Sequence, residues 1–251
     1  MIAGTDESVL GLTSLGDALY VMRLSSSEVE VYDVTTFTSR PSLSVPGLGS
    51  TSRGLAACGV NNCLYVSDCW NNQLHRVDLS GSNDVIKWST AAQPAALHLT
   101  SDHHVIVACY SAKKLQEFTT DGSAVREICL QFNPWHAVPL ASKQFAVSAY
   151  AGHQVHVVVA GGQTVRNYGS GTAGSGVGQL SGPMMLAVAA DNTVLVADQY
   201  NNRLVVIDAS LTTASEVSLN LTAGNTLQRP WCLALDASRG RLYVGEFGGN
   251  N

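Results

Sequence analysis

Short apolar segments alternate with polar turns along the chain, and the clearest run lies between residues 182 and 208. Three apolar segments, at Leu186–Ala189, Val194–Ala197 and Leu204–Ile207, are separated by turns rich in aspartate and asparagine. Segments this short, bounded by such turns, are typical of β-strands rather than helices. Because three short strands bury little apolar surface alone, we expect them to pack against further copies of the same unit.

The same pattern of apolar segments and polar turns recurs roughly every 40–50 residues. When the copies are aligned, the second segment of three copies ends in an acid, at Asp68, Asp198 or Glu246. In the other three copies the equivalent residues are Arg23, Cys109 and Ala149. A period of this length with several strands per copy indicates a β-propeller. A β-sandwich, the alternative, does not require a loop motif to recur in register.

We therefore predict an all-β fold, a six-bladed β-propeller that forms one domain over residues 1–251. The predicted blades span residues 8–48, 51–91, 92–132, 133–179, 180–226 and 227–251. We expect their outer strands at Ser42–Val45, Asp84–Ser89, Ala124–Leu130, Thr164–Tyr168 and Glu216–Leu221. The last blade is incomplete in this chain, with two strands only, so we expect the natural protein to continue past Asn251 as part of a larger multidomain protein.

Composition and charge narrow the class of partner. Hydrophobic residues make up 45% of the chain and charged residues only 13%, which suits many short strands buried on both faces. No apolar run is long enough to span a bilayer, so we predict no membrane insertion. The net charge of −5 disfavours a partner bound mainly through its phosphates. The first ten residues lack the basic and apolar regions of a signal peptide, which favours the cytoplasm without fixing the compartment.

Potential metal ligands are scattered along the chain. None of the six cysteines has the paired spacing of a zinc site. Cys58 and Cys63 flank a turn and could form a cross-strand disulfide, although buried free thiols are the favoured interpretation. Of the seven histidines only His136 lies where an inner strand begins, so three do not converge. We predict no metal, no cofactor and no catalytic residue, with a metal-dependent lyase or hydrolase as an alternative.

A resemblance to a known repeat rests on Gly174–Pro183, the strand that ends at Asp198, and the Asn-Asn-Arg-Leu run that ends at Leu204. Together these resemble the NHL repeat. The copies around Asp68 and Glu246 carry the same elements with less fidelity, and the other three copies lack the aspartate. The resemblance implies a six-bladed propeller, like the domain of the tripartite-motif NHL proteins. Such domains mostly serve as binding platforms, and a minority, such as the zinc-dependent amidating lyase, carry chemistry.

The recurring acids Asp68, Asp198 and Glu246 each stand where a strand turns into a loop that carries asparagines. A carboxylate at such a position can accept hydrogen bonds from backbone N–H groups of the loop. One acid in each of several copies indicates an architectural role. We therefore interpret the three acids as structural rather than catalytic.

One end of the predicted propeller gathers aromatic residues. The loops that lead into the inner strands and the loops that join second to third strands open on the same face. The first set carries Arg53, Trp135, His136, Arg229 and Trp231. The second set carries Trp70, Tyr110, Tyr150, Tyr200 and Phe247, with Arg203 close behind in the chain. Together these residues would surround one mouth of the central channel.

Aromatic and arginine side chains are what protein interfaces concentrate at their hot spots. We therefore predict a non-catalytic binding domain, monomeric itself, that presents this face to a protein or peptide. The alternative for each ring is packing between neighbouring blades, but we expect at least two rings to be exposed. Single-stranded RNA is a second possible partner, because rings stack on bases and Arg53, Arg203 and Lys113–Lys114 supply positive charge.

Overall fold

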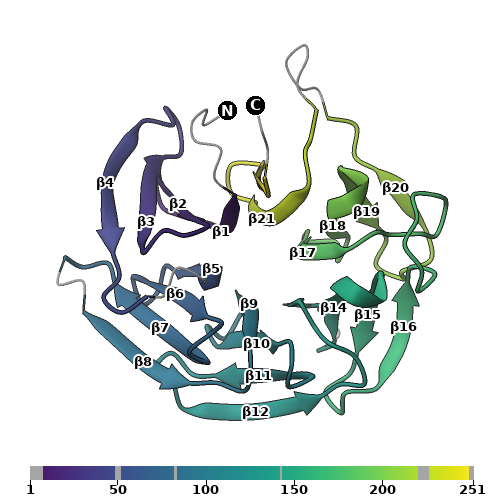
Figure 1. The fold of residues 1–251 in the computed structure, drawn as a ribbon, viewed down its shortest axis with the longest axis horizontal. Coiled ribbons are helices and arrows are strands. Elements are labelled where there is room, and N and C mark those ends of the chain that lie inside the picture. Colours follow the sequence, from purple (N-terminus) through teal and green to yellow (C-terminus); the bar gives the residue numbers. More distant parts are fainter. Residues whose placement is uncertain (1–7, 49–51, 82–83, 142, 220–225, 249–251) are drawn as a thin grey trace.

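The computed structural model describes residues 8–48, 52–81, 84–141, 143–219 and 226–248. These residues form 22 β-strands and two single-turn 3₁₀ helices, and they include no helix long and apolar enough to cross a membrane. The strands form five four-stranded sheets and one two-stranded sheet that radiate from a central axis (Figure 1). The predicted all-β propeller fold is therefore confirmed.

The first three sheets run outward from the axis in sequence order. The first sheet contains β1–β4, at Val9–Leu15, Ala18–Arg23, Glu28–Asp33 and Ser39–Ser44. The second contains β5–β8, at Ser52–Cys58, Cys63–Asp68, Gln73–Asp78 and Val85–Ser89. The third contains β9–β12, at Pro94–Leu99, Val105–Cys109, Lys114–Phe118 and Ala124–Cys129.

The remaining sheets complete the ring. The fourth contains β13–β16, at His136–Pro139, Phe145–Ala149, Gln154–Val158 and Thr164–Tyr168. The fifth contains β17–β20, at Pro183–Val188, Val194–Asp198, Arg203–Ile207 and Ala214–Glu216. The two-stranded sheet contains β21 and β22, at Pro230–Asp236 and Arg241–Glu246. The 3₁₀ helices η1 and η2 span Tyr150–Gly152 and Gln199–Asn201.

Burial changes from the axis to the rim. The second strands β2, β6, β10 and β14 are buried at every position, because a neighbouring sheet covers each of their faces. The outer strands β12 and β16 are mostly exposed and carry polar or charged side chains. The core therefore lies between neighbouring sheets rather than in one central mass. Packing of this kind holds each sheet in place and fixes where its loops emerge.

The repeat identified in the sequence corresponds to one position in each sheet. The last residue of the second strand is, in chain order, Arg23, Asp68, Cys109, Ala149, Asp198 or Glu246. The fifth outer strand differs from its prediction. β20 is only three residues long and ends at Glu216, where the predicted strand begins, and part of the predicted segment lies outside the described residues. Exposed edge strands are specified weakly, because few side-chain contacts fix their register.

Two buried serines link neighbouring sheets. Ser67 Oγ accepts a hydrogen bond from Gly54 N in its own sheet at 2.8 Å and donates to Ala95 O of the next sheet at 3.1 Å. Ser148 Oγ accepts from His136 N at 3.1 Å and donates to Met184 O at 2.6 Å. Both serines immediately precede the motif position, so the same link recurs in two sheets.

The two-stranded sheet fits between the fifth sheet and the first. Cys232 Sγ lies 3.2 Å from Val9 O, and Gly248 N donates to Ser8 Oγ at 2.8 Å. The Arg241 guanidinium also donates to Val34 O. A Cβ on Gly245 would lie 2.6 Å from Val9 Cγ1, so this glycine allows the two ends of the described chain to approach closely. All six cysteines are free thiols, including the register partners Cys58 and Cys63.

Candidate functional site

Six aromatic rings from four sheets meet at one mouth of the central channel. We call Tyr110, Trp135, Tyr150, Tyr200, Trp231 and Phe247 the aromatic cluster. Trp135 is its centre, with ring centroids 5.9 Å from Tyr110, 5.6 Å from Tyr150 and 5.3 Å from Trp231. The cluster continues to Tyr200 through Tyr150, at 6.0 Å, and to Phe247 through Trp231, at 4.6 Å.

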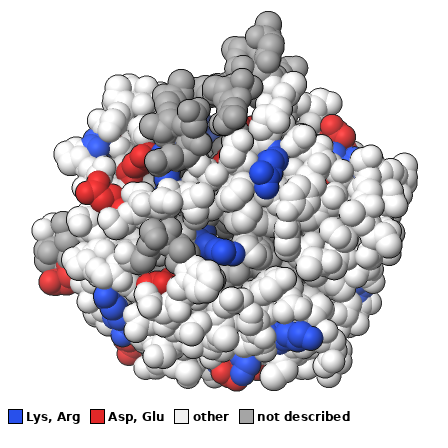
Figure 2. Space-filling model, viewed as in Figure 1, with Lys and Arg blue, Asp and Glu red and all other residues white. Residues whose placement is uncertain are grey.

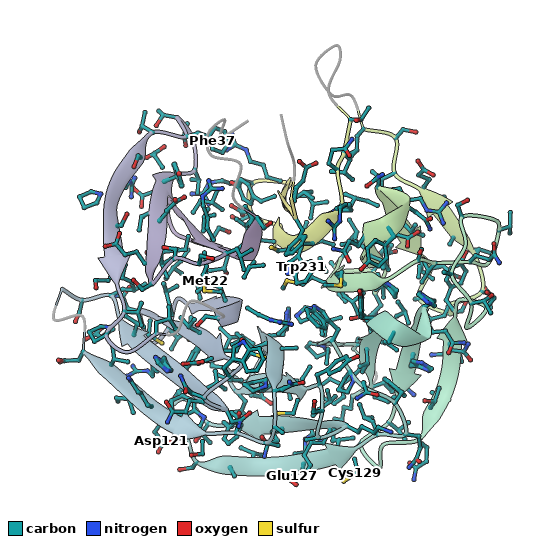
Figure 3. The ribbon with its side chains drawn as sticks, in the orientation of Figure 1. Met22, Phe37, Asp121, Glu127, Cys129 and Trp231 are labelled. Carbon is teal, nitrogen blue, oxygen red and sulfur yellow. The ribbon has the colours of Figure 1, made fainter. Side chains whose placement is uncertain are left out.

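The two tryptophans form the floor of this cluster. Trp135 immediately precedes β13, where its N–H donates to Ser148 O at 2.8 Å, and Trp231 is the second residue of β21. Trp135 belongs to the fourth sheet and Trp231 to the sixth. Their rings are perpendicular and in contact, so the two residues meet across the inner end of the fifth sheet. Figure 3 shows Trp231 at the inner edge of the ring of sheets. With 6% and 8% of their surfaces exposed, both tryptophans are packed residues.

The tyrosines above this floor are more accessible. Tyr200 is 48% exposed, whereas Tyr110 and Tyr150 are half-buried. The Tyr150 and Tyr200 hydroxyls form a hydrogen bond, and burial together with this bond raises the pKa of Tyr150 to about 12. Tyr150 therefore stays neutral at physiological pH. The tyrosines can offer apolar ring surface and hydroxyl hydrogen bonds to a partner.

Two arginines cap the rings. The Arg53 guanidinium lies 5.4 Å from the Trp135 ring centroid. The Arg229 guanidinium lies 4.8 Å from Phe247 and 5.6 Å from Tyr200. Each contact is a cation–π interaction, which holds a charged group beside an apolar surface. The mouth of the channel thus combines aromatic area with positive charge.

Three of the residues predicted for the binding face are not part of the aromatic cluster. Trp70 is 64% exposed and makes no ring contact with a described residue. Arg203 pairs with Asp198 at 2.7 Å and donates to the Ser175 and Gln179 carbonyls, so it holds the glycine-rich connection. His136 is 2% exposed and lines the channel cavity, where its ring nitrogens bond to Leu97 O and Leu186 N.

The recurring acids and the asparagine pairs that follow them hold the loops by hydrogen bonds. Asp198 is fully buried, where it accepts hydrogen bonds from Ser181 N at 2.6 Å and Asn201 Nδ2 at 2.7 Å. The next residue, Asn202, is left-handed and its Oδ1 accepts from Arg229 N at 2.8 Å, at the start of the next sheet. The acid therefore fixes its own loop, while the second asparagine fixes the loop that carries Arg229.

The copy at Asp68 repeats this arrangement. Asp68 is fully buried and accepts hydrogen bonds from Asn71 N at 3.3 Å and from Asn71 Nδ2 at 2.8 Å. Asn72 is left-handed, and its Oδ1 accepts from Gln93 N at 2.8 Å. In the third copy Glu246 Oε1 accepts from Gln228 N at 2.7 Å. The three carboxylates are occupied by hydrogen bonds of the loops that they position.

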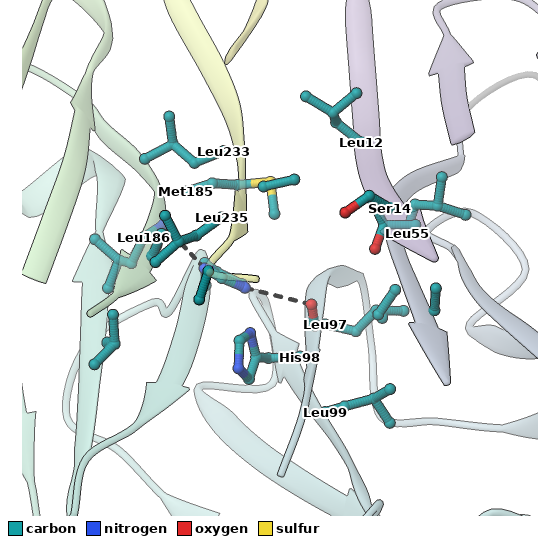
Figure 4. Close-up of a pocket in the computed structure, with 18 residues that line it drawn as sticks. Leu12, Ser14, Leu55, Leu97, His98, Leu99, Met185, Leu186, Leu233 and Leu235 are labelled. Carbon is teal, nitrogen blue, oxygen red and sulfur yellow. Dashed lines mark hydrogen bonds between the residues drawn. The ribbon is translucent and has the colours of Figure 1, made fainter. Parts of the chain in front are cut away.

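A cavity of about 260 Å³ lies along the channel, below the aromatic cluster. Apolar side chains from the inner strands line it, with His98 and His136 beside each other at a ring separation of 5.8 Å (Figure 4). His136 Nδ1 accepts a hydrogen bond from Leu186 N at 3.0 Å, so Nε2 carries the proton and donates to Leu97 O at 3.3 Å. His136 thereby links three inner strands, a role that its position in the sequence does not reveal.

Both channel histidines are neutral. Burial lowers the pKa of His98 to about 4. Burial, followed by the proximity of His98, lowers the pKa of His136 to about 3. His98 makes no side-chain hydrogen bond to a described residue, and sequence analysis had singled out only His136. Among the described residues no three His, Cys, Asp or Glu side chains come together in a group that could hold a metal ion.

Charge is sparse on the face drawn in Figure 2. Most of that surface is uncharged, the acidic side chains lie toward the rim, and one basic side chain lies in a hollow near the centre. A long stripe of basic side chains, which would follow a nucleic-acid backbone, is not visible in this view. The surface at the mouth of the channel therefore consists mainly of aromatic and other uncharged groups, with a few separate cationic side chains.

Comparison with known proteins identifies the fold but no family. No family model and no curated protein matches the sequence. A catalytically inactive virginiamycin B lyase from Staphylococcus aureus, crystallised with quinupristin, has a TM-score of 0.66 and 10% identity, over 97% of this chain and 86% of that one. Hydrazine synthase from Kuenenia stuttgartiensis has a TM-score of 0.68 and 16% identity, over 96% and 75%. A Bacteroides thetaiotaomicron protein of unknown function has a TM-score of 0.76 and 13% identity, over 96% and 67%.

Proposed function

We propose that this chain is a non-catalytic binding domain whose aromatic cluster receives a protein or peptide partner. The observation that carries the proposal is the convergence of six rings and two arginines, from five sheets, at one mouth of the channel. Such a set, with a packed floor and an exposed Tyr200, has the composition of an interface hot spot. Asp198 and Glu246, together with Asn202, hold the loops that carry Tyr200 and Arg229, so this part of the surface is preorganised.

We further propose that the chain is an NHL-type propeller and that β21 and β22 are the inner half of a sixth blade. The resemblance of the sequence motif supports this, because the motif position ends the second strand in β22 as in the five four-stranded sheets. The contacts of β21 and β22 with the first sheet also support the proposal, because an inner blade half would pack against the first blade in this way.

A lyase or hydrolase in the channel is the weaker candidate. The lyase among the similar structures supports it at the level of the fold only. Both ring nitrogens of His136 are occupied by backbone groups, so it would have to give up a hydrogen bond to bind a metal or move a proton. His98 alone does not supply the several groups that such chemistry requires.

The test is selection from a random peptide library displayed on phage, with the whole chain as bait. Peptides that are enriched are then measured by fluorescence anisotropy against wild type, Tyr200→Ala and Val165→Ala. Val165 is the matched control, because it is 48% exposed like Tyr200 but lies on β16 at the rim. We expect Tyr200→Ala to weaken binding about tenfold or more, and Val165→Ala to leave the affinity within about twofold.

Two outcomes would overturn this proposal. One is that no peptide is enriched, or that enriched peptides bind Tyr200→Ala as tightly as wild type. The other is preferential binding of a labelled random single-stranded RNA, with an affinity that falls steeply between about 50 and 200 mM salt. That result would assign the face to RNA.

A further inference from the structure

Two arginines at the channel mouth have no hydrogen-bond or ion-pair partner among the described residues, unlike most of the other arginines. Five arginines pair with carboxylates, namely Arg23, Arg40, Arg126, Arg203 and Arg239. Arg166 and Arg241 donate to an amide and to a backbone carbonyl, and Arg76 lies beside the Cys63 thiol and the Tyr65 hydroxyl. The guanidinium groups of Arg53 and Arg229 form no ion pair and no hydrogen bond with any described residue, only contacts with rings.

The lack of a hydrogen-bond partner is least favourable at Arg229. Its Nε is buried and has no hydrogen-bond partner among the described residues. A buried donor without an acceptor is unfavourable, and native proteins rarely leave a charged one unsatisfied. Asn202 Oδ1 holds the backbone of Arg229, so the side chain is positioned at the mouth rather than placed there by chance. The structure therefore points to an external acceptor for the guanidinium at its two terminal nitrogens, because Nε itself is closed to a ligand.

The two guanidinium groups are joined by a row of ring contacts, and a second path from Arg229 through Tyr200 and Tyr150 returns to Trp135. From one end the order is Arg53, Trp135, Trp231, Phe247 and Arg229, with each member in contact with the next. The middle of the row is apolar and its ends are cationic. A ligand that complements the row has an apolar centre and a negative charge toward each end.

We propose, building on the proposed function, that the aromatic cluster binds an acidic peptide segment in which two carboxylates bracket an apolar residue. Each carboxylate accepts hydrogen bonds from one guanidinium, and the apolar side chain lies against the accessible tyrosines Tyr110, Tyr150 and Tyr200 above the packed tryptophans. A guanidinium and a carboxylate can form two parallel hydrogen bonds, which makes this pairing both strong and directional. The acids of the surrounding loops do not compete, because Asp198 and Glu246 already accept bonds from backbone N–H groups.

A peptide fits these rings better than a nucleic acid. Base stacking requires an open ring face, but Trp231 is stacked on Phe247 with 22° between the planes, and Arg53 lies over Trp135. Less than a tenth of either tryptophan is exposed. Two separate cations also make a small contribution to a polyanion that carries a charge on every nucleotide.

The experiment uses the whole chain and labelled synthetic peptides of 8–12 residues. Each peptide has one Leu or Trp between two acids, at a range of spacings, and a twin in which Asn or Gln replaces both acids. Fluorescence anisotropy gives the affinity of each twin for wild type, Arg53→Gln, Arg229→Gln and the rim control Arg166→Gln. Arg166 lies on β16 and only approaches the Gln144 amide, at 3.5 Å.

We expect at least one acidic peptide to bind wild type ten times more tightly than its amide twin. Arg53→Gln and Arg229→Gln should each remove most of this preference, because the acidic peptide loses more affinity than its amide twin, whereas Arg166→Gln should keep the preference. Titration of wild type with salt gives a measurement that does not depend on how the variants fold. Between 50 and 500 mM salt the acidic peptide should weaken several-fold more than its twin.

The outcomes separate this inference from the proposed function. If acidic and amide peptides bind equally and both require Tyr200, the face is a peptide site without acid selectivity, and this inference is wrong while the proposed function stands. If no peptide of either kind binds, and library selection also fails, both are wrong. If Arg166→Gln loses the preference for the acidic peptide as much as Arg53→Gln and Arg229→Gln do, this inference is also wrong, because the effect would then reflect the overall charge of the protein.

Discussion

The hydroxyl oxygens of Tyr150 and Tyr200 lie 2.5 Å apart although 50 residues separate them in the chain. Each tyrosine belongs to the connection between the second and third strands of its sheet, in η1 and η2. The hydrogen bond therefore joins equivalent loops of two neighbouring sheets. Gly182 lies beneath both rings, and its N–H donates to His153 Nδ1 at 3.1 Å.

Gly182→Ala should disturb this tyrosine pair. The φ of Gly182 is +65°, and a Cβ there would lie 2.8 Å from Tyr200 Cδ2 and 3.1 Å from Tyr150 Cε2. Gly178→Ala is a matched control, because its φ is +74° and its Cβ would meet nothing within 4 Å. The control should lose about 1 kcal/mol of stability from the left-handed backbone alone. We expect Gly182→Ala to lose about 1–3 kcal/mol more in urea denaturation. Equal losses would show that the rings move aside freely.

Ser148→Ala should weaken the link between the fourth and fifth sheets. The variant leaves His136 N and Met184 O without their buried hydroxyl partner. Leaving buried polar groups unsatisfied costs about 1–3 kcal/mol, which a urea titration would measure as a lower midpoint. Ser215→Ala, at an exposed position of β20, should change stability by less than about 0.5 kcal/mol. If both variants unfold at the wild-type midpoint, the serine bridge does not stabilise the ring.

Asp198→Asn tests the structural role of the recurring acid. The carboxylate is fully buried, and the variant leaves the Arg203 guanidinium without its buried charged partner, with only the exposed Glu216 carboxylate 3.6 Å away. Breaking one side of a buried ion pair costs about 3–5 kcal/mol. Asp191→Asn is the control, because this exposed turn aspartate accepts a bond only from Thr193 N. Thermal melts should show a large loss for Asp198→Asn and little for Asp191→Asn. A catalytic acid would instead leave the melting temperature nearly unchanged.

Stability should fall in mild acid because burial lowers the pKa of four histidines, His75 and three others. Burial lowers the pKa of His98 and of His156 to about 4, and that of His136 to about 3. In the unfolded chain a histidine titrates near pH 6.5, so below that pH the unfolded state binds more protons. The stabilisation is complete above about pH 6.5 and declines as pH falls toward 4, by up to about 1.4 kcal/mol per pH unit for each histidine.

Urea titrations between pH 7 and pH 5 measure this slope. His98→Asn should reduce the slope, whereas His103→Asn should not, because His103 is exposed on a turn. A free energy of unfolding that stays constant over this range would mean that the four rings are accessible to protons in the folded state.

The propeller and the aromatic face follow from the sequence because both depend on local patterns that repeat. The second strands are buried on both faces and read as continuous apolar runs, so β6 and β18 end where the motif acids Asp68 and Asp198 indicate. The aromatic residues follow from position alone, since loops at the same end of each sheet share a face. Tyr200 and Trp70 are exposed, whereas Trp135, just before β13, and Trp231, in β21, are buried.

The remaining features depend on contacts between sheets, which a linear pattern does not contain. His136 lies in a loop-to-strand position like its neighbours, but its ring turns into the channel because Leu97 O and Leu186 N bind both nitrogens. Arg203 forms an ion pair with the buried Asp198 carboxylate, which lies opposite it in the same hairpin. The serine links could be anticipated from the recurrence of Ser67 and Ser148 before the motif position, although their partners lie in the next sheet.

Hydrogen–deuterium exchange of the whole chain, with and without the tightest-binding peptide, tests most directly whether the aromatic face is the binding surface. We predict slower exchange in the connections that carry Tyr110, Tyr150 and Tyr200, and no change in the turns around Gly16, Asn192 and Gly240 at the opposite ends of the sheets. Protection confined to those opposite turns or to the outer strands would contradict the account.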